Sequence, residues 1–206
     1  MEIKWLGHSC FQISHEGHSV VLDPYNPDMI PGLGALHVRA NQVLCSHEHD
    51  DHNYRKAVLL ENTSTPNPFT VERIASFHDA VYGAKRGENY LTILSAGGLR
   101  IAHLGDIGCA LSKEQEEKLY GLGAVMIPIG GHFTIGPEDA KLLCDRIRPK
   151  VIIPMHYRGK TFGFSTLGTL DAFTILFHLT KINQYDIDTI LINATTQKQI
   201  ALLKFK

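Results

Sequence analysis

The sequence lacks a long apolar run, and this absence excludes a membrane-spanning helix. Of its 206 residues, 44% are hydrophobic and 20% are charged, the composition of an ordinary soluble globular protein. No apolar stretch approaches the roughly 20 residues that a helix needs to cross a bilayer. The start of the chain, residues 1–5, predicts a strand and lacks the apolar centre of a signal peptide. We therefore expect a cytoplasmic protein with no membrane partner.

Cysteine is scarce, and none of it forms a Cys-x-x-Cys pair. The four cysteines stand far apart, at Cys10, Cys45, Cys109 and Cys144. Free cysteine packs like a small apolar residue and stays reduced in the cytosol. We expect all four to be reduced and buried.

Neither sign of charge is in excess. The chain holds 20 Lys and Arg against 21 Asp and Glu, for a net charge of -1, and it has no basic block. Nonspecific nucleic-acid binding depends on basic side chains that neutralise phosphates. Nucleic acid is therefore not the expected partner, and a small-molecule substrate is.

Histidine, by contrast, is plentiful, with 12 residues in the chain. Its main concentration is the segment His47-Glu48-His49-Asp50-Asp51-His52, which follows the apolar residues 43–45. A helix would scatter these side chains around its circumference, whereas a strand followed by a tight turn can bring them to one point. Neutral imidazole and carboxylate suit zinc and similar divalent ions. The segment predicts a metal-binding turn, and one for two metal ions.

The pattern His-x-His-x-Asp-His resembles the metallo-β-lactamase superfamily of metallohydrolases. Other landmarks of the superfamily recur in the expected order, up to about residue 158. Within the superfamily, the chain looks most like the small stand-alone hydrolases related to ascorbate-6-phosphate lactonase, which share the motifs Gly7-His8-Ser9, Asp23-Pro24, Gly105-Asp106 and Met155-His156-Tyr157. The resemblance implies a mixed α/β fold, the four-layer αββα sandwich.

The resemblance also implies the metal ligands. One ion would be held by His47, His49 and, by position, His78. The second would be held by Asp51, His52 and His156, and Asp106 would bridge both ions. Each of the distant ligands follows a predicted strand. His103 is the alternative to His78, but we expect it to be a structural hydrogen bonder, with a role behind the ligands as the other interpretation.

The ligand types favour one metal over another. Flavodiiron members of the superfamily carry a glutamate where His49 stands, so nitrogen at this position favours zinc over a redox di-iron site. Manganese stays open, because the lactonase-like relatives can use it. We expect two divalent ions, and zinc is the favoured metal.

The order of elements favours one domain over residues 1–206, because no low-complexity linker divides the chain. Strands are predicted over 2–5, 10–14, 18–22, 41–45, 71–77, 90–95, 99–103, 124–128, 151–154, 187–192 and 199–205. Helices are predicted over 53–60, 112–120, 137–147 and 170–179. Residues 24–40 predict an irregular loop.

The predicted mechanism uses water rather than a protein nucleophile. Two cations lower the pKa of a shared water, and Asp51 ligates the second ion and orients or deprotonates that water. Asp51 is therefore the predicted catalytic residue. Ser46 and Cys45 are predicted to be structural.

Further polar residues are candidates with two interpretations each. Asp23 either accepts an N–H from a metal-bound histidine or caps the following loop with an Asx turn. His8 either contacts substrate near the cleft mouth or makes a core hydrogen bond. His132 either donates a proton to a leaving group or is a solvated loop residue. Arg86, with Lys85 and Asn89, either holds an anionic group or lies on an exposed loop.

The leading hypothesis is a metal-dependent hydrolase with a dinuclear site, acting on a small-molecule ester, lactone or phosphoester, with an anionic substrate as one form. A phosphodiesterase or ribonuclease of the same superfamily is the second hypothesis. The third is a non-catalytic, metal-binding regulatory module, although no ligand of the motif is lost. The loops over 24–40, 79–89 and 157–170 are expected to shape the pocket.

Overall fold

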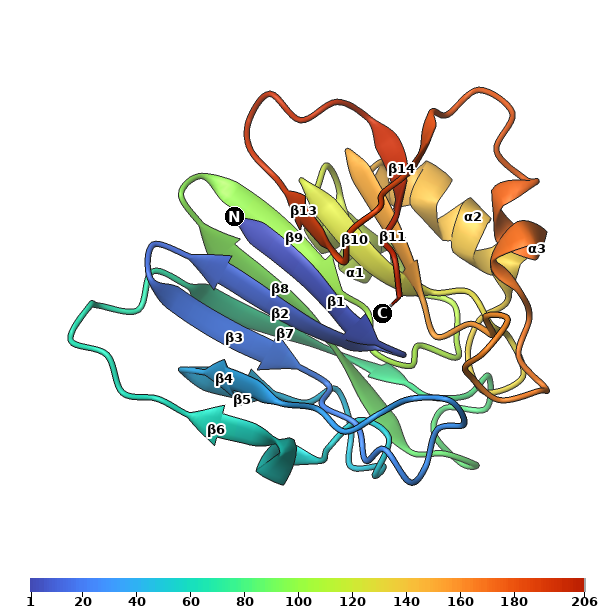
Figure 1. Ribbon diagram of the computed structural model, residues 1–206. Helices are drawn as coiled ribbons and strands as arrows, with labels where there is room; N and C mark the ends of the chain where they lie inside the picture. Colours follow the sequence, from blue (N-terminus) through green and yellow to red (C-terminus); the bar gives the residue numbers. More distant parts are fainter. Residues whose placement is uncertain (206) are drawn as a thin grey trace.

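The computed structural model describes residues 1–205 and contains two large β-sheets that face each other, besides a two-stranded ribbon (Figure 1). The first sheet has the strand order β13-β1-β2-β3-β5: β13 (Thr189–Leu191), β1 (Glu2–Gly7), β2 (Cys10–His15), β3 (His18–Leu22) and β5 (Gln42–Leu44). The second has the order β12-β14-β11-β10-β9-β8-β7: β12 (Ile182–Gln184), β14 (Gln199–Leu202), β11 (Val151–Met155), β10 (Ala124–Pro128), β9 (Leu99–His103), β8 (Glu88–Ala96) and β7 (Thr70–Phe77).

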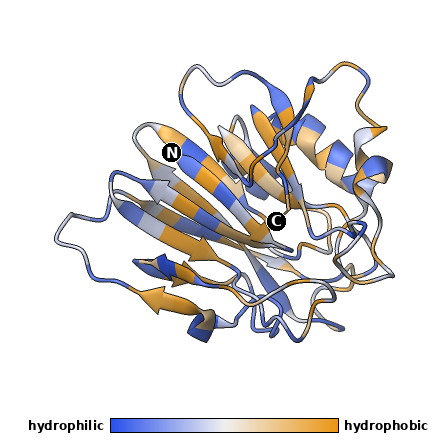
Figure 2. Cartoon of the chain, in the orientation of Figure 1, coloured by the Kyte–Doolittle hydropathy of each residue, from blue (hydrophilic) through white to orange (hydrophobic). Residues whose placement is uncertain are grey.

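The hydrophobic core lies between these sheets, and Figure 2 shows the apolar residues concentrated on their strands. In β1, Ile3 and Trp5 are buried while Glu2 is exposed, which is the period-two pattern of a strand with one solvated face. The parallel strands β10 and β11 are buried at every position. Such strands read as continuous apolar runs because both of their faces are covered.

Three helices lie on the outer side of the seven-stranded sheet: α1 (Lys113–Leu119), α2 (Pro137–Ile147) and α3 (Leu170–Thr174) (Figure 1). Helix α1 starts at the predicted capping box, in which Ser112 and Gln115 exchange side-chain and backbone hydrogen bonds. Helix α2 has the predicted proline at its first turn. None of the helices within residues 1–205 is long and apolar enough to cross a membrane.

The predicted helix over 53–60 is wrong. A short 3-10 helix, η1 (Arg55–Ala57), is followed by a strand, β6 (Val58–Leu60). This strand pairs in parallel with β4 (Val38–Ala40), which lies inside the segment predicted as an irregular loop. The pairing partner is distant in sequence, so the local pattern of residues 53–60 could not indicate this strand pairing. The β4–β6 ribbon lies next to β3 of the five-stranded sheet.

Smaller differences concern the end of the chain and the cysteines. The helix predicted over 170–179 ends at Thr174, and β12 was not predicted. The four cysteines are free, as expected, and three of them are buried. Cys109 is partly exposed, which corrects the prediction that all four are buried, because it lies in the loop after β9 rather than in a strand.

The directions of the strands gather their ends at one edge of each sheet. Strands β1, β3 and β5 run the same way, because β2 is antiparallel to β1 and β3 while β3 and β5 are parallel. Strands β7, β9, β10 and β11 also share one direction. The residues that follow all these strands therefore lie at the same edge of their sheet. The mixed α/β architecture implied by the sequence is confirmed, with two packed sheets and helices outside the larger one.

Candidate metal centre

The histidine turn begins directly after β5. It is closed by backbone hydrogen bonds from His52 and Asn53 to the carbonyl of His49, at 2.9 and 2.8 Å. The donor atoms of His47 and His49 lie within 4.8 Å of each other and of His78, which follows β7. His47 and His78 are buried, whereas His49 is exposed. This first group therefore contains three imidazoles that follow strands of two different sheets.

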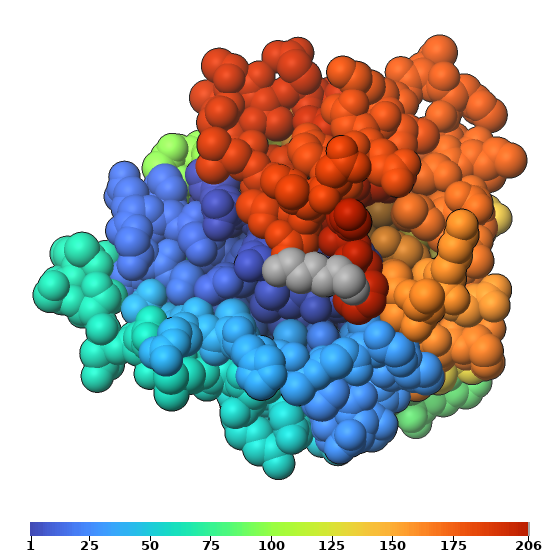
Figure 3. Space-filling view, viewed as in Figure 1, coloured from blue at the N-terminus to red at the C-terminus, as the bar shows by residue number. Residues whose placement is uncertain are grey.

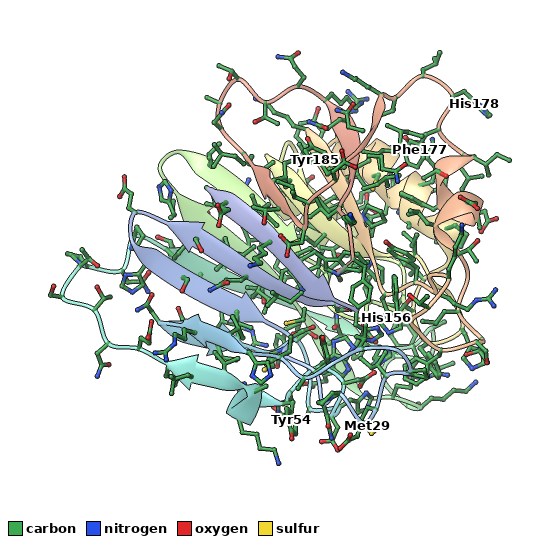
Figure 4. The ribbon with its side chains drawn as sticks, in the orientation of Figure 1. Met29, Tyr54, His156, Phe177, His178 and Tyr185 are labelled. Atoms are coloured by element: carbon green, nitrogen blue, oxygen red, sulfur yellow. The ribbon has the colours of Figure 1, made fainter. Side chains whose placement is uncertain are left out.

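A second group forms beside the first. It contains Asp51, His52 and His156, and their donor atoms also lie within 4.8 Å of one another. His8, which was predicted to contact substrate or to make a core hydrogen bond, belongs to the same group. Figure 4 shows His156 near the end of β1, where the two sheets meet.

Asp106 lies between the two groups. Its Oδ2 atom is 3.3 Å from Nε2 of His78, 3.2 Å from Nε2 of His52 and 3.0 Å from Nε2 of His156. One carboxylate oxygen thus contacts an imidazole of the first group and two of the second.

Hydrogen bonds behind the imidazoles determine which ring nitrogen is free. Nδ1 of His52 lies 2.8 Å from Oδ2 of Asp23, and Nδ1 of His78 lies 3.1 Å from the carbonyl of Phe133. Both partners can only accept here, so each Nδ1 carries the hydrogen. The hydroxyl of Ser46 donates to Asp23 at 2.6 Å and therefore accepts from Nδ1 of His47 at 2.9 Å. In His47, His52 and His78 the other nitrogen, Nε2, is left by these contacts to face the site, where it can offer a lone pair to a cation that displaces its proton.

The site fits a divalent cation. The buried atoms Nε2 of His47, Nε2 of His52 and Oδ1 of Asp106 have no hydrogen-bond partner among the described residues. Buried polar atoms are normally paired, because an unpaired one costs about 1–3 kcal/mol. Cations held by imidazole nitrogen and carboxylate oxygen would satisfy such atoms.

The protonation of the site also suits a cation. Burial, followed by repulsion from His52, lowers the pKa of His47 to about 3, so this imidazole is neutral at pH 7. Burial would raise the pKa of Asp106, but His156 and His52 outweigh it and hold the pKa well below its usual value. Burial opposes charge on His52 too, yet Asp106 and Asp51 raise its pKa well above 6.5. The surrounding carboxylates therefore favour positive charge at this point.

Two residues contact the candidate ligands from outside the cluster, and one of them differs from its sequence interpretation. Asn89 was grouped with Arg86 as an anion holder, but its side chain is fully buried and its Oδ1 accepts from the backbone N–H of Asp106 at 2.8 Å. Ser46 was predicted to be structural, and its hydroxyl links Asp23 to His47, which is compatible with that prediction. The available signals for these roles were positions: Ser46 lies just before the histidine motif, and Asn89 lies in the strand beside Asp106.

Asp23, His103 and His132 each fit one of their two interpretations better than the other. Asp23 accepts from His52 and from Ser46, which matches the first of its two interpretations rather than an Asx turn. His103 uses both ring nitrogens, toward the carbonyl of Ser9 at 2.8 Å and the N–H of Gly105 at 3.1 Å, in keeping with a structural role. His132 is exposed and does not line the cleft described next, so it matches the solvated interpretation.

The metal groups open into a cleft of about 570 Å³. Its outer wall contains one residue from each predicted loop: Met29, Arg86 and Phe164. Phe133, from the turn after β10, completes the wall and was not predicted. The guanidinium of Arg86 lies 5.5 Å from the centre of the Phe133 ring. The cleft therefore has an apolar wall with one cation.

Two of these loops hold each other in place at the surface. Gly163 donates its N–H to the carbonyl of Pro31 at 2.9 Å, and Figure 3 shows the segments around residues 30 and 160 side by side. Gly32 has a φ of 76°, and a Cβ there would lie 1.9 Å from the carbonyl oxygen of Thr161. Only glycine fits this close approach.

The loop that bears Arg86 is organised around Asp79. The Asp79 carboxylate accepts four backbone N–H bonds, from Val81, Gly83, Lys85 and Arg86, at 2.8–2.9 Å. Burial would raise the pKa of this carboxyl, but the four donors lower it to about 2. An ionised Asp79 thus fixes the loop and the backbone position of Arg86.

The fold and the cluster of imidazoles and carboxylates define the class of protein as a metal-dependent hydrolase of the metallo-β-lactamase fold. A family model described as the β-lactamase superfamily domain matches residues 2–156, and the chain belongs to this superfamily.

Relatives agree with this assignment. A UPF0173 metal-dependent hydrolase of Symbiobacterium thermophilum is 30% identical over 194 residues, with 76% of this chain and 84% of the relative covered. One from Caldivirga maquilingensis is 27% identical over 186 residues, with 75% and 81% covered. A Thermotoga maritima crystal structure, provisionally described as a zinc-dependent hydrolase of the metallo-β-lactamase superfamily, superposes with a TM-score of 0.75 at 28% identity. It covers 98% of this chain and 97% of its own.

The first prediction concerns Gly105, which precedes Asp106. Its φ is 54°, and a Cβ there would lie 2.4 Å from Cβ of Ser46 and 2.3 Å from Oδ1 of Asn89. We expect Gly105→Ala to lower the free energy of unfolding by about 1–3 kcal/mol, the cost of overpacking a filled site. Urea denaturation of the metal-free protein measures it. Gly34→Ala is the control, because no atom lies within 4 Å of its Cβ position, and equal effects at both glycines would contradict the prediction.

The second prediction concerns Asp23. Asp23→Asn replaces the carboxylate that orients His52, so we expect zinc affinity to fall about 10–100-fold, as for other residues that orient metal ligands. Competition with a chromogenic chelator measures the affinity. Ser46→Ala, which leaves the contact between Asp23 and His52 intact, should cost less. Zinc affinity unchanged in Asp23→Asn would show that this hydrogen bond does not tune the site.

Proposed function

We propose that the protein hydrolyses a small-molecule ester, lactone or phosphoester with a site that holds two divalent cations. One observation carries the proposal: Oδ2 of Asp106 has imidazole nitrogens from both groups within 3.3 Å. A carboxylate shared between two ions needs this arrangement. Zinc is the expected metal because imidazole predominates, and manganese, which prefers oxygen, is the alternative.

In this proposal, His47, His49 and His78 hold the first ion, His52, His156 and Asp51 hold the second, and Asp106 is shared. When bound, such ions lower the pKa of a water towards neutrality and stabilise negative charge on an attacked carbonyl or phosphoryl group. Asp23, Ser46 and the carbonyl of Phe133 keep Nε2 of three imidazoles free for this purpose.

Asp51 is the proposed catalytic residue. It lines the cleft, and its side chain is 20% exposed, whereas the side chain of Asp106 is 2% exposed. Burial would raise the pKa of Asp51, but the neighbouring His52 and His8 lower it, so the carboxylate is ionised at neutral pH. An ionised carboxylate at the cleft surface can accept a hydrogen bond from the attacking water and hold its proton.

The cleft suggests a substrate with an anionic group and an apolar part. Arg86 is the single Lys or Arg among the described residues that line it, and the guanidinium lies against Phe133. Phe133 also packs edge-on against Phe164, with ring centres 5.8 Å apart. An aromatic wall beside one guanidinium suits a carboxylate or phosphate on a small, partly apolar molecule.

The ribonuclease alternative is weaker on the same grounds. A polynucleotide needs a basic track that follows its phosphates, and this chain has a net charge of -1 and one cation in its cleft. The likeness to lactonase-like hydrolases stays a prediction, as do the single domain over residues 1–206 and the cytoplasmic location, which free cysteines suit.

The test of the function is a substrate panel assayed with Asp51→Ala. The wild-type protein, loaded with zinc or manganese, is offered esters, lactones, thioesters and phosphodiesters, RNA included. We expect turnover of a small ester, lactone or phosphoester, and a fall of about 10²–10⁴-fold in Asp51→Ala, the usual contribution of a general base.

Circular dichroism and metal analysis accompany this assay, so that lost folding or a lost ion is recognised. Activity retained in a folded Asp51→Ala variant would remove Asp51 from the mechanism. Turnover of RNA alone would favour the ribonuclease, and inactivity throughout, in protein that holds two ions, would favour a binding module.

The anionic preference has its own prediction. Arg86→Gln should raise KM for an anionic substrate about tenfold or more, the loss of one charge-assisted hydrogen bond, while a neutral analogue is affected little. Lys85→Gln is the matched control, since Lys85 has the same charge on the same loop but is exposed outside the cleft. Equal KM changes in both variants would indicate a general effect of charge instead of a contact with Arg86.

A further inference from the structure

The backbone of His8 is held by hydrogen bonds beside the second metal group. His8 occupies the turn between β1 and β2 with a φ of 51°, a conformation uncommon for residues other than glycine. Its carbonyl accepts hydrogen bonds from Nε1 of Trp5 at 3.0 Å and from the N–H of His156 at 3.4 Å. Its ring is 4.1 Å, centre to centre, from the ring of His156. Unusual backbone geometry that is fixed by its surroundings often serves a site.

Neither ring nitrogen of His8 has a hydrogen-bond partner within the described chain, although the residue is only 2% exposed. His103, which is also buried, has a hydrogen-bond partner at both ring nitrogens. A core histidine is expected to be paired, since an unpaired buried nitrogen costs free energy. His8 is therefore not explained by packing alone.

The spacing of donor atoms identifies what His8 can bind. Nε2 of His8 lies 3.6 Å from Oδ2 of Asp51, which is too long for a hydrogen bond. Nε2 of His52 lies at the similar distance of 3.7 Å from the same oxygen. Two atoms that each ligate one zinc ion at about 2.1 Å are about 3.0–3.6 Å apart when the ligand angle is about 90–120°. His8 and His52 thus have the same relation to Asp51.

We propose that His8 is a further protein ligand of the second cation, beside Asp51, His52 and His156. The donor atoms of these four residues lie within 4.8 Å of one another. The inference rests on the proposed two-ion site and deepens it by making the two positions unequal. The second ion has an additional ligand and buried histidines, whereas the first depends on the exposed His49. The second position is therefore the one that holds its ion more tightly.

The experiment measures zinc and cobalt binding to the metal-free protein by titration, with the visible spectrum of bound Co²⁺ as a second readout. His8→Asn is the test variant, because asparagine tolerates positive φ and its shorter side chain withdraws the donor. We expect the tighter of the two ions to bind at least tenfold more weakly, with a changed Co²⁺ spectrum, while the other ion is little affected.

His18→Asn is the control for loss of a buried histidine, because His18 lies at the start of β3, away from the strand ends that bear the site. It should leave both binding constants and the spectrum unchanged. If His8→Asn folds poorly, His8→Gln is measured instead under the same criteria.

Wild-type affinities for both ions in the His8 variant, with an unchanged spectrum, would overturn the inference. They would leave His8 a contact for Asp51 or substrate. The two-ion proposal fails separately, on the wild-type protein, if that binds fewer than two ions. In that case, a tenfold loss of the single ion in His8→Asn would still support ligation by His8, and an unchanged affinity would still refute it.

Discussion

The structure of the site depends on one carboxylate surrounded by imidazoles. Asp106 lies at 3.0–3.3 Å from nitrogens of three histidines, all of them buried. Imidazoles and a carboxylate gathered at such distances favour a cation, because several of their buried atoms are otherwise unpaired in a dry interior. The contacts of Asn89, Asp23 and Ser46 keep these groups oriented toward one another. The fold thus keeps its ligands in place by hydrogen bonds outside the ligand cluster.

Much of this was predictable because ligands in this chain follow strands. Strands such as β9, β10 and β11 are evident from their apolar runs, and a polar residue at the end of such a run stands out. The segment 47–52 needed no tertiary information, since its ligands are neighbours in sequence. The pairing of β4 with β6 was not predictable, because each is a strand of three residues and the partners are 20 positions apart. The local pattern there suited a helix equally well.

The supporting residues were harder to predict than the ligands. A ligand is recognised by its type, whereas Ser46, Asn89 and Phe133 act through partners that only the folded chain supplies. Asn89 was placed in a loop, but β8 begins at Glu88, and the alternation of the strand turns the asparagine inward to Asp106. Phe133 contributes a backbone carbonyl to His78, and a carbonyl carries no signature in the sequence.

The two sheets contribute different halves of the site, which couples metal binding to folding. His8, Asp23 and the histidine turn follow strands of the five-stranded sheet, whereas His78, Asp106 and His156 follow strands of the seven-stranded sheet. Each group of donors draws on both sheets, so an ion in either position joins them. Because the unfolded chain has no such arrangement, the free energy of binding adds to the free energy of folding. In the proposed site, a cation would then link the two sheets as well as supply the chemistry, and the residues that hold it would be constrained by both roles.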